Sequence, residues 1–193
     1  MKILETERTV LREWRPEDID ALAQINADPR VLEFIPGPIT REQTQAFIER
    51  CIAHQHEHGF GLWAVELKQT GALIGFGGLN IPQDNLPFSP CVEIGARGAH
   101  EHWGRWYPIE IGKAVLKAAF TTYGLDEVVA FTNINNLRSR ICMERLGFTR
   151  DLAGDFLHPR LPAEHPLALH VLYRIDNPQT AAFKHPLQAP RKQ

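Results

Sequence analysis

The stretch from Cys91 to Phe148 constrains the fold of this chain more than any other, because strand and helix patterns alternate through it. Residues 92–97 have the pattern of a strand, and residues 128–132 form a short apolar run typical of a second one. Between them, residues 107–123 carry an apolar stripe at helical spacing. A further helix is predicted to run through Leu146. The alternation predicts an α/β layer fold in which helices cover a sheet.

A glycine-bearing turn joins the first of these strands to the long helix, and it reads HWGRWY over residues 102–107. A turn of this kind can direct successive backbone N–H groups at an anion, and the positive end of the helix dipole adds to their effect. The sequence therefore predicts a phosphate-binding turn at the start of the helix.

The first half of the chain supplies further helices and strands. Residues 9–14 alternate as a strand does, and Pro16 suits the first turn of a helix that closes near residue 29. Thr40 and Gln43 have the spacing of a capping box, which predicts a second helix ending near Gly59. Two strands are predicted at residues 62–67 and 72–79.

The last part of the chain gives weaker signals. Residues 151–166 are rich in proline, and we predict an irregular segment there. A strand is expected at residues 167–175. Residues 177–193 have the composition of a tail that is ordered only if it docks on something. One domain over residues 1–176, followed by this tail, is the expected organisation.

Composition narrows the classes of function. A chain of 193 residues with 44% hydrophobic content can bury one substantial core. The formal net charge of −2 gives no basic footprint for nucleic acid or for an anionic membrane surface. No run has the length of a membrane-spanning helix, and the first ten residues lack the apolar stretch of a signal peptide. We expect a cytoplasmic protein without nucleic-acid or membrane partners.

Cysteine and histidine spacing does not predict a metal site. The three cysteines are far apart and odd in number, which is typical of reduced, packed thiols. His54 and His58 share a helix face at the spacing that can hold zinc, but no third ligand is evident. We therefore expect no metal.

Several separate motifs, in this order, resemble a known family. VEIG at residue 92, HWGRWYPIE at residue 102, NNLRS at residue 135 and MERLGF at residue 143 follow a helix-helix-strand-strand pattern. This series is similar to GNAT acetyltransferases and, more narrowly, to the RimJ/RimL-type N-acetyltransferases found in bacteria. The resemblance extends from Leu4 to Ile175.

The resemblance implies a single-domain GNAT fold, an α+β mixed sheet that is twisted and splays open beside the strand at residues 92–97. Acetyl-CoA would lie in the opening as the acetyl donor, with its pantetheine arm paired to this strand and its pyrophosphate on the turn. The residues so implied in binding acetyl-CoA are Ala96, Arg97 and Gly98 along the strand, His102, Trp103, Gly104, Arg105, Trp106 and Tyr107 in the turn, and Asn136 on the other lip.

The implied reaction is direct acyl transfer from acetyl-CoA to an amine in a ternary complex. The amine must lose a proton and the thiolate must gain one. Glu93 is the candidate general base and Ser139 the candidate proton donor to sulfur. Glu93 has a simpler interpretation as a carboxylate at a strand edge, and Ser139 as a first-turn helix residue. The acceptor is either a protein N-terminus or a small-molecule amine, and a homodimer is compatible with the resemblance.

The turn departs from the family pattern, which normally reads W-G-x-G-Y-A-T-E. Trp106 replaces the second glycine, and Ala96 and Gly98 stand where relatives usually have an aromatic residue and a leucine. Two hypotheses follow. In the first, the Trp106 ring fills the space vacated at Ala96 or Gly98. In the second, it blocks the phosphate position, and the chain is a catalytically impaired GNAT-fold module for binding or regulation.

Overall fold

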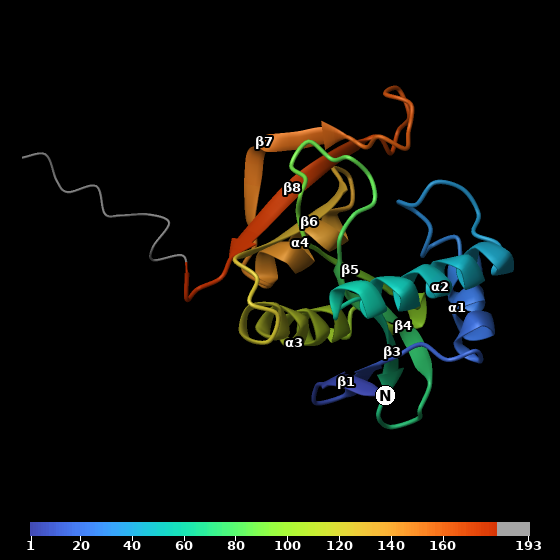
Figure 1. Cartoon of the computed structure of the whole chain (residues 1–193). Helices are drawn as coiled ribbons and strands as arrows, with labels where there is room; N and C mark the ends of the chain where they lie inside the picture. The colour runs from blue at the N-terminus through green and yellow to red at the C-terminus, as the bar shows by residue number, and fades with distance from the viewer. Residues whose placement is uncertain (181–193) are drawn as a thin grey trace, which may run out of the picture.

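A computed structural model of the 193-residue chain describes residues 1–180. In this part of the chain, eight strands form one mixed sheet in the order β1-β2-β3-β4-β5-β6-β8-β7. Figure 1 shows how the strands and helices are arranged in space. The strands are β1 (Lys2–Glu5), β2 (Thr9–Arg12), β3 (Leu62–Leu67), β4 (Leu73–Asn80), β5 (Glu93–Gly98), β6 (Glu127–Asn133), β7 (Thr149–Leu157) and β8 (Leu169–Asp176). The helices are α1 (Asp18–Ala27), α2 (Arg41–His58), α3 (Tyr107–Thr121), α4 (Leu137–Arg145) and a 3-10 turn, η1 (His100–His102).

The sheet opens between β5 and β6. These strands run parallel and share a single register pair, Glu93 with Val129, where the N–H of Val129 donates to the Val92 carbonyl at 2.9 Å. By contrast, β4 and β5 pair over the whole length of β5. The predicted splay beside this strand is therefore present. We call the opening beyond Glu93 and Val129 the seam.

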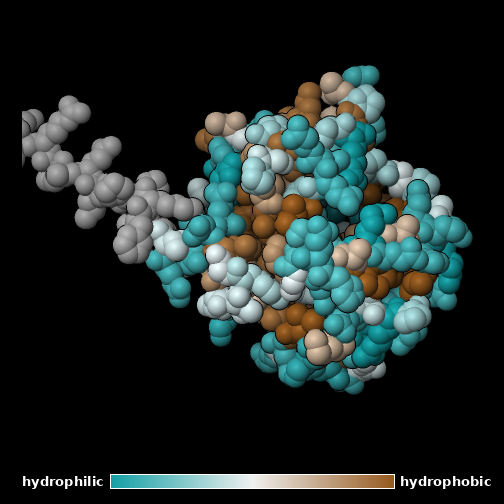
Figure 2. All heavy atoms as spheres, in the orientation of Figure 1, coloured by the Kyte–Doolittle hydropathy of each residue, from teal (hydrophilic) through white to brown (hydrophobic). Residues whose placement is uncertain are grey.

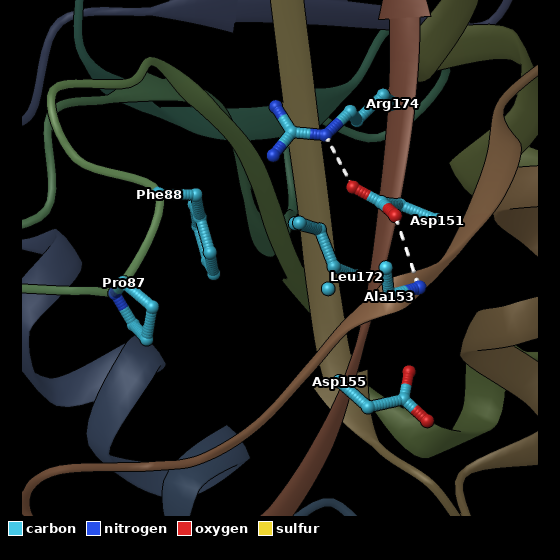
Figure 3. Close-up of a pocket in the computed structure, with 8 residues that line it drawn as sticks. Pro87, Phe88, Asp151, Ala153, Asp155, Leu172 and Arg174 are labelled. Atoms are coloured by element: carbon cyan, nitrogen blue, oxygen red, sulfur yellow. Dashed lines mark hydrogen bonds and ion pairs between the residues drawn. The ribbon is translucent and has the colours of Figure 1, made fainter.

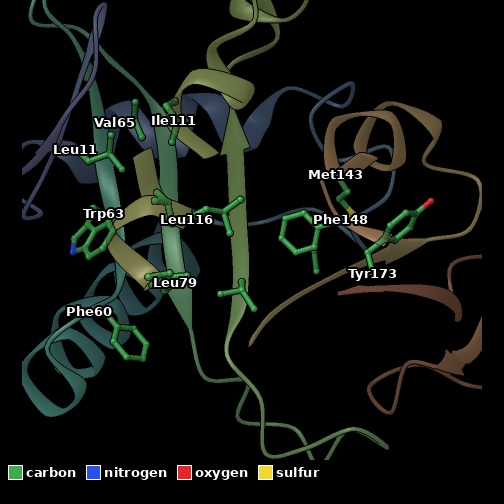
Figure 4. Packing of buried hydrophobic residues seen from close by; sticks show 14 of the residues in the cluster. Leu11, Phe60, Trp63, Val65, Leu79, Ile111, Leu116, Met143, Phe148 and Tyr173 are labelled. Atoms are coloured by element: carbon green, nitrogen blue, oxygen red, sulfur yellow. The ribbon is translucent and has the colours of Figure 1, made fainter. Parts of the chain in front are cut away.

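Helices cover both faces of the sheet, as expected for this fold class. On one face, α3 and α4 close a core that includes Trp63, Val115 and Tyr173 (Figure 4). On the other face, α1 and α2 pack over a second cluster that contains Trp14 and Phe76. The two clusters fix the sheet between two helical layers.

The helix boundaries follow the predicted caps. The Gln43 N–H donates to Thr40 Oγ1 at 3.2 Å, and the Thr40 N–H donates to Gln43 Oε1 at 2.8 Å. At the other end of α2, Gly59 takes a left-handed φ of 77°. The capping box and the glycine stop are both confirmed. At α1, the helix begins two residues after Pro16, at Asp18.

The prediction of an irregular segment at residues 151–166 is wrong for its first part. Residues 149–157 form β7, which pairs antiparallel with β8 and has a register break between Asp151 and Phe156. Most of β7 is exposed, so it lacks the apolar alternation by which a strand is recognised. The short β1 strand was also not predicted.

The predicted tail begins too early. Asn177 is buried, and its N–H and Nδ2 donate to the Asp126 and Leu125 carbonyls at 2.8 and 3.1 Å. The rest of the predicted tail, residues 181–193, lies outside the described residues. Within residues 1–180, no helix combines the length and hydropathy needed to span a bilayer.

Candidate active site

Strand alternation determines which groups of β5 face the seam. Because the Val92 carbonyl accepts from β6, the backbone groups of Ile94, Ala96 and Gly98 point the same way. Beyond Glu93, no β5–β6 pairing is present among the described residues. Along this edge, Ala96 and the N–H of Gly98 can therefore accept an extended ligand as an added strand, whereas the Gly98 carbonyl is engaged by the Trp103 side chain. This edge is where the family resemblance implies that the pantetheine arm would lie.

Glu93 lies at the start of the seam and is the last residue of β5 that pairs with β6. Its Oε1 accepts a hydrogen bond from Asn80 Nδ2 at 2.8 Å. Burial raises the pKa of Glu93 to about 7, although the Asn80 hydrogen bond and Arg160 act in the opposite direction. A carboxylate with a pKa near neutrality is suited to general-base work.

The structure leaves fewer N–H groups of the predicted phosphate turn available than the sequence suggested. The His102 and Trp103 N–H groups donate to the Ala99 and His100 carbonyls, each at 3.0 Å. These two amides are engaged within η1 and are not available to an anion. The N–H groups of the four following residues, 104–107, have no hydrogen bond among the described residues. They lead directly into α3, whose dipole adds to their effect.

Trp106 adopts the backbone conformation of the glycine it replaces. Its φ is 67°, and it is the one non-glycine residue with positive φ among residues 1–180. Tryptophan takes this conformation at an energetic cost, as predicted. The side chain is 55% exposed, and the Arg145 guanidinium lies 4.5 Å from its ring centroid.

The first hypothesis for Trp106, that its ring fills space near Ala96 and Gly98, is contradicted. A hollow of about 60 Å³ is lined there by Ala96, Gly98 and Trp103, and Trp106 is not part of its lining. The indole that approaches Gly98 is that of Trp103, whose Nε1 donates to the Gly98 carbonyl at 2.9 Å. Trp106 turns away from this hollow.

The first turn of α4 forms the other lip of the seam. Asn136 caps this helix: its Oδ1 accepts from the Ser139 N–H at 3.2 Å, and its Nδ2 donates to Thr132 Oγ1 at 3.0 Å. The predicted cap is confirmed. Ser139 is half-buried. Arg138 packs 4.7 Å from the Trp103 ring, so α4 contacts the turn at both of its ends.

The side chain of Arg97 is a feature that the sequence reasoning missed, because that reasoning used only the backbone of β5. Arg97 Nη1 donates to Asn26 Oδ1 at 2.7 Å, and the guanidinium lies 5.4 Å from the Phe76 ring centroid. Burial lowers the pKa of Arg97 to about 10. The available signal was a single charged residue in the otherwise uncharged run that follows Glu93.

An aromatic cluster lies on the same sheet face as Glu93, beyond the seam. Phe131 of β6 and His170 of β8 belong to it, and the His158 and His170 ring centroids are 5.0 Å apart. His170 Nδ1 donates to the Ala168 carbonyl, and His158 Nδ1 accepts from the Arg160 N–H. Burial lowers the pKa of both histidines, which favours their neutral forms.

A pocket of about 220 Å³ opens further along this face, beneath the loop that leads to β5 (Figure 3). Phe88 and Leu172 supply its apolar walls, and the Arg174–Asp151 ion pair at 2.9 Å lies on its rim. In the orientation of Figure 1, hydrophobic residues gather at the centre of the visible face with hydrophilic residues around them (Figure 2).

His54 has a structural role. Its Nδ1 contacts the Phe60 carbonyl at 3.0 Å, and its Nε2 accepts from the Ile81 N–H at 3.0 Å. Both ring nitrogens are therefore engaged, and neither is available to a metal ion.

Comparisons with known proteins agree with this geometry. A family model for the acetyltransferase (GNAT) domain matches residues 8–149. The chain is 29% identical over 154 residues to the uncharacterized N-acetyltransferase p20 of Bacillus licheniformis, covering 78% of this chain and 84% of that protein. It also matches the crystal structure of an acetyltransferase from Agrobacterium tumefaciens, with 30% identity, a TM-score of 0.72, and 91% and 94% of the two chains covered.

The spermidine N-acetyltransferase of Vibrio cholerae, solved in complex with CoA and spermine, has the same fold. Its TM-score is 0.68 at 17% identity, with 88% of this chain and 95% of that chain covered. With the open seam, the helix-start turn and the family match over most of the sequence, the chain belongs to the GNAT family of acetyltransferases.

Proposed function

We propose that this protein transfers an acetyl group from acetyl-CoA to an amine, as an N-acetyltransferase of the RimJ/RimL type. The observation that carries the proposal is the seam. A strand edge that is unpaired at Ala96 and at the Gly98 N–H, and a carboxylate with a pKa near 7 at Glu93, lie together where the described part of the sheet opens. The strand edge can bind the acetyl donor, and the carboxylate can accept the proton that the amine loses.

The residues present fit acetyl-CoA. The N–H groups of residues 104–107, at the positive end of α3, suit the pyrophosphate. The unpaired edge of β5 suits the amides of a pantetheine arm, and we propose that Asn136, which caps α4 on the opposite lip, contacts this arm. The similar Vibrio cholerae enzyme was solved with CoA, which supports this choice of donor.

Glu93 has the role of proton acceptor. When bound, acetyl-CoA supplies a thioester whose C–S bond breaks as the new C–N bond forms, giving an acetamide and the CoA thiol. Glu93 takes the proton that the amine gives up, directly or through a water. Ser139 is the proposed source of the proton that the sulfur gains. A free N–H of β5 would stabilise the negative charge on the carbonyl oxygen, a role worth ~3 kcal/mol.

The alternative, an impaired module that binds without turnover, depended on Trp106 blocking the turn. The Trp106 backbone has the left-handed conformation that glycine would take, and its ring is directed toward Arg145 and solvent. We therefore do not propose the impaired module. The proposed acceptor is a primary amine, of a small molecule or of a protein N-terminus.

The test is release of free CoA thiol from acetyl-CoA in the presence of a panel of primary amines, with calorimetry of acetyl-CoA binding in parallel. We expect thiol release that depends on an amine, with stoichiometric formation of the acetamide. Binding without release for any amine would overturn the enzymatic proposal. Absence of binding would overturn the proposed donor.

A further inference from the structure

Arg97 lies on the same face of β5 as Glu93. Successive side chains of a strand alternate between faces, so Glu93, Gly95 and Arg97 share one face, and Ala96 lies on the other. The contacts agree, because Arg97 reaches Asn26 of α1, whereas Ala96 lies toward Ile111 of α3. The candidate base and the guanidinium therefore lie on the same face of β5.

The charge of Arg97 has no carboxylate partner among the described residues. Arg12, the other substantially buried arginine on this half of the sheet, shows the usual arrangement. Its guanidinium contacts the Asp18 carboxylate at 2.7 and 2.8 Å and the Glu66 carboxylate at 2.6 Å. Arg97 has a single hydrogen bond, to the neutral amide of Asn26. A partly buried cation without a counter-ion is costly, which calls for a ligand of opposite charge.

The surroundings hold the guanidinium in one orientation. Asn26 is 1% exposed, and its Nδ2 donates to Thr44 Oγ1 at 3.0 Å, so its oxygen is fixed toward Arg97. The Thr44 hydroxyl in turn donates to the Thr40 carbonyl at 3.0 Å. This chain of bonds anchors Nη1 alone.

The other nitrogens of Arg97 remain available. Neither Nε nor Nη2 has a hydrogen bond in the described part of the chain. The buried side-chain nitrogens without a partner in this part of the chain do not include either of them. Both therefore keep contact with solvent. Two adjacent guanidinium N–H groups in a fixed plane match the two oxygens of a carboxylate.

We propose that Arg97 binds the carboxylate of the acceptor, so that the substrate is an amine that also carries a carboxylate, of the amino-acid type. This inference rests on the proposed N-acetyltransferase function. The acceptor would lie along β5, with its amine at Glu93 and its carboxylate at Arg97. Gly95 lies between them on the same face and contributes no side chain, and Leu62 of β3 packs over it, since a Cβ built at Gly95 would lie 3.3 Å from Leu62 Cδ2. At ~3.3 Å per residue, the two Cα atoms are about 13 Å apart.

The experiment compares kcat/KM for matched acceptor pairs. Each pair is a free amino acid and its carboxamide, and the series includes ω-amino acids of increasing chain length. A charge-assisted hydrogen bond of about 1.5–3 kcal/mol predicts that the best carboxylate acceptor exceeds its amide by about 10- to 150-fold. Equal or better use of the amides would overturn the inference while leaving the proposed function intact. No acetylation of any amine would instead overturn the proposed function.

Variants then assign the preference to Arg97. We expect Arg97→Gln to reduce the carboxylate-to-amide ratio to within about threefold, and Arg97→Lys to restore part of it. Asn26→Asp keeps the shape of the anchor but supplies an internal carboxylate, and it should also lower the ratio. Arg41→Gln removes an exposed guanidinium of α2 that pairs with Asp20, and this matched control should leave the ratio as it is.

Two other outcomes would also overturn the inference. If Arg97→Gln weakens acetyl-CoA binding and lowers the rates for both acceptor classes equally, the guanidinium serves the donor. If an amine that carries a phosphate is preferred over every carboxylate, the anion is of another class. Thermal denaturation of each variant would verify that the protein is folded.

Discussion

Glu93 is held in an environment that opposes its ionisation. With a pKa of about 7 in the folded protein against 4.5 ordinarily, it keeps a proton between these two values that the unfolded chain has lost. The folded state is therefore destabilised as pH rises through this window, by up to about 3 kcal/mol above pH 7. Such a cost at one carboxyl group is typical of functional sites.

Glu93→Gln should separate stability from activity. We expect the free energy of unfolding of the variant to match that of the wild type near pH 4 and to exceed it by up to about 3 kcal/mol at pH 8. Urea denaturation at both pH values measures this difference. Activity should fall by a factor on the order of 10² or more. A variant that is no more stable at pH 8 would mean that Glu93 ionises normally.

The activity of the wild-type protein should follow the ionisation of the same group. Because a base must be deprotonated to accept a proton, kcat/KM should rise with pH and level off above an apparent pKa of about 7. A profile of kcat/KM against pH at saturating acetyl-CoA checks this. An acidic limb near 4.5 would rule out the buried carboxylate as the base.

Trp106 combines a strained backbone with an outward side chain. Trp106→Gly removes a left-handed conformation that costs ~1–2 kcal/mol and a cation–π contact with Arg145 worth ~0.5–1 kcal/mol. The two effects nearly cancel, so we expect a small change in stability and less than a threefold change in the Kd of acetyl-CoA. Arg145→Gln keeps the ring but removes the contact and is the matched variant. Calorimetry showing tenfold tighter binding by Trp106→Gly would mean that the ring obstructs the donor.

At the scale of elements, the position of the β5 edge that faces the seam depends on how closely β5 approaches β4 on its other side. Gly75 has a φ of 144°, and a Cβ built there would lie 2.0 Å from the Arg97 carbonyl oxygen. Any side chain at residue 75 would therefore push β5 away from β4. The geometry of the seam therefore depends on two features of β5: its close contact with Gly75 of β4 on one side, and its lack of pairing with β6 on the other.

Gly75→Ala should damage both the fold and the binding of the donor. We expect it to lower the free energy of unfolding by more than about 2 kcal/mol, because a Cβ clash with backbone cannot be relieved by a rotamer change. Gly71→Ala is the control: φ is 70°, but the space around it is open, so only the conformational cost of about 1 kcal/mol is expected. Equal effects of the two substitutions in urea denaturation would contradict the close approach.

At the scale of the whole molecule, one register pair joins β5 to β6, and the shared core beneath α3 and α4 supplies the rest of the connection. Amide hydrogen exchange should reveal this asymmetry. We expect the Ala96 and Gly98 amides, which face the seam, to exchange faster than the Arg97 amide, which faces β4. Acetyl-CoA should slow the first two. Protection of all three before the donor is added would mean that the seam is closed in solution.

Much of the fold followed from local chemistry. The capping box at Thr40, the cap at Asn136 and the alternation of strand and helix around residue 107 each depend on neighbours in sequence, and each is present. β7 could not be predicted in this way, because it is an exposed strand whose hydrogen bonds go to β8 rather than to nearby residues. The homodimer remains a prediction.

The sequence by itself determined the family, the order of the elements and the position of the turn before α3, since caps, periodicity and motifs act over a few residues. Only the tertiary structure decided which backbone groups and side chains of the turn and of β5 remain available to a ligand. It engaged the His102 and Trp103 amides within η1, turned Trp106 outward and gave Arg97 no carboxylate partner among residues 1–180. The environments of Trp106 and Arg97 depend on groups that are distant in sequence, Arg145 and Asn26, and sequence spacing does not encode that proximity.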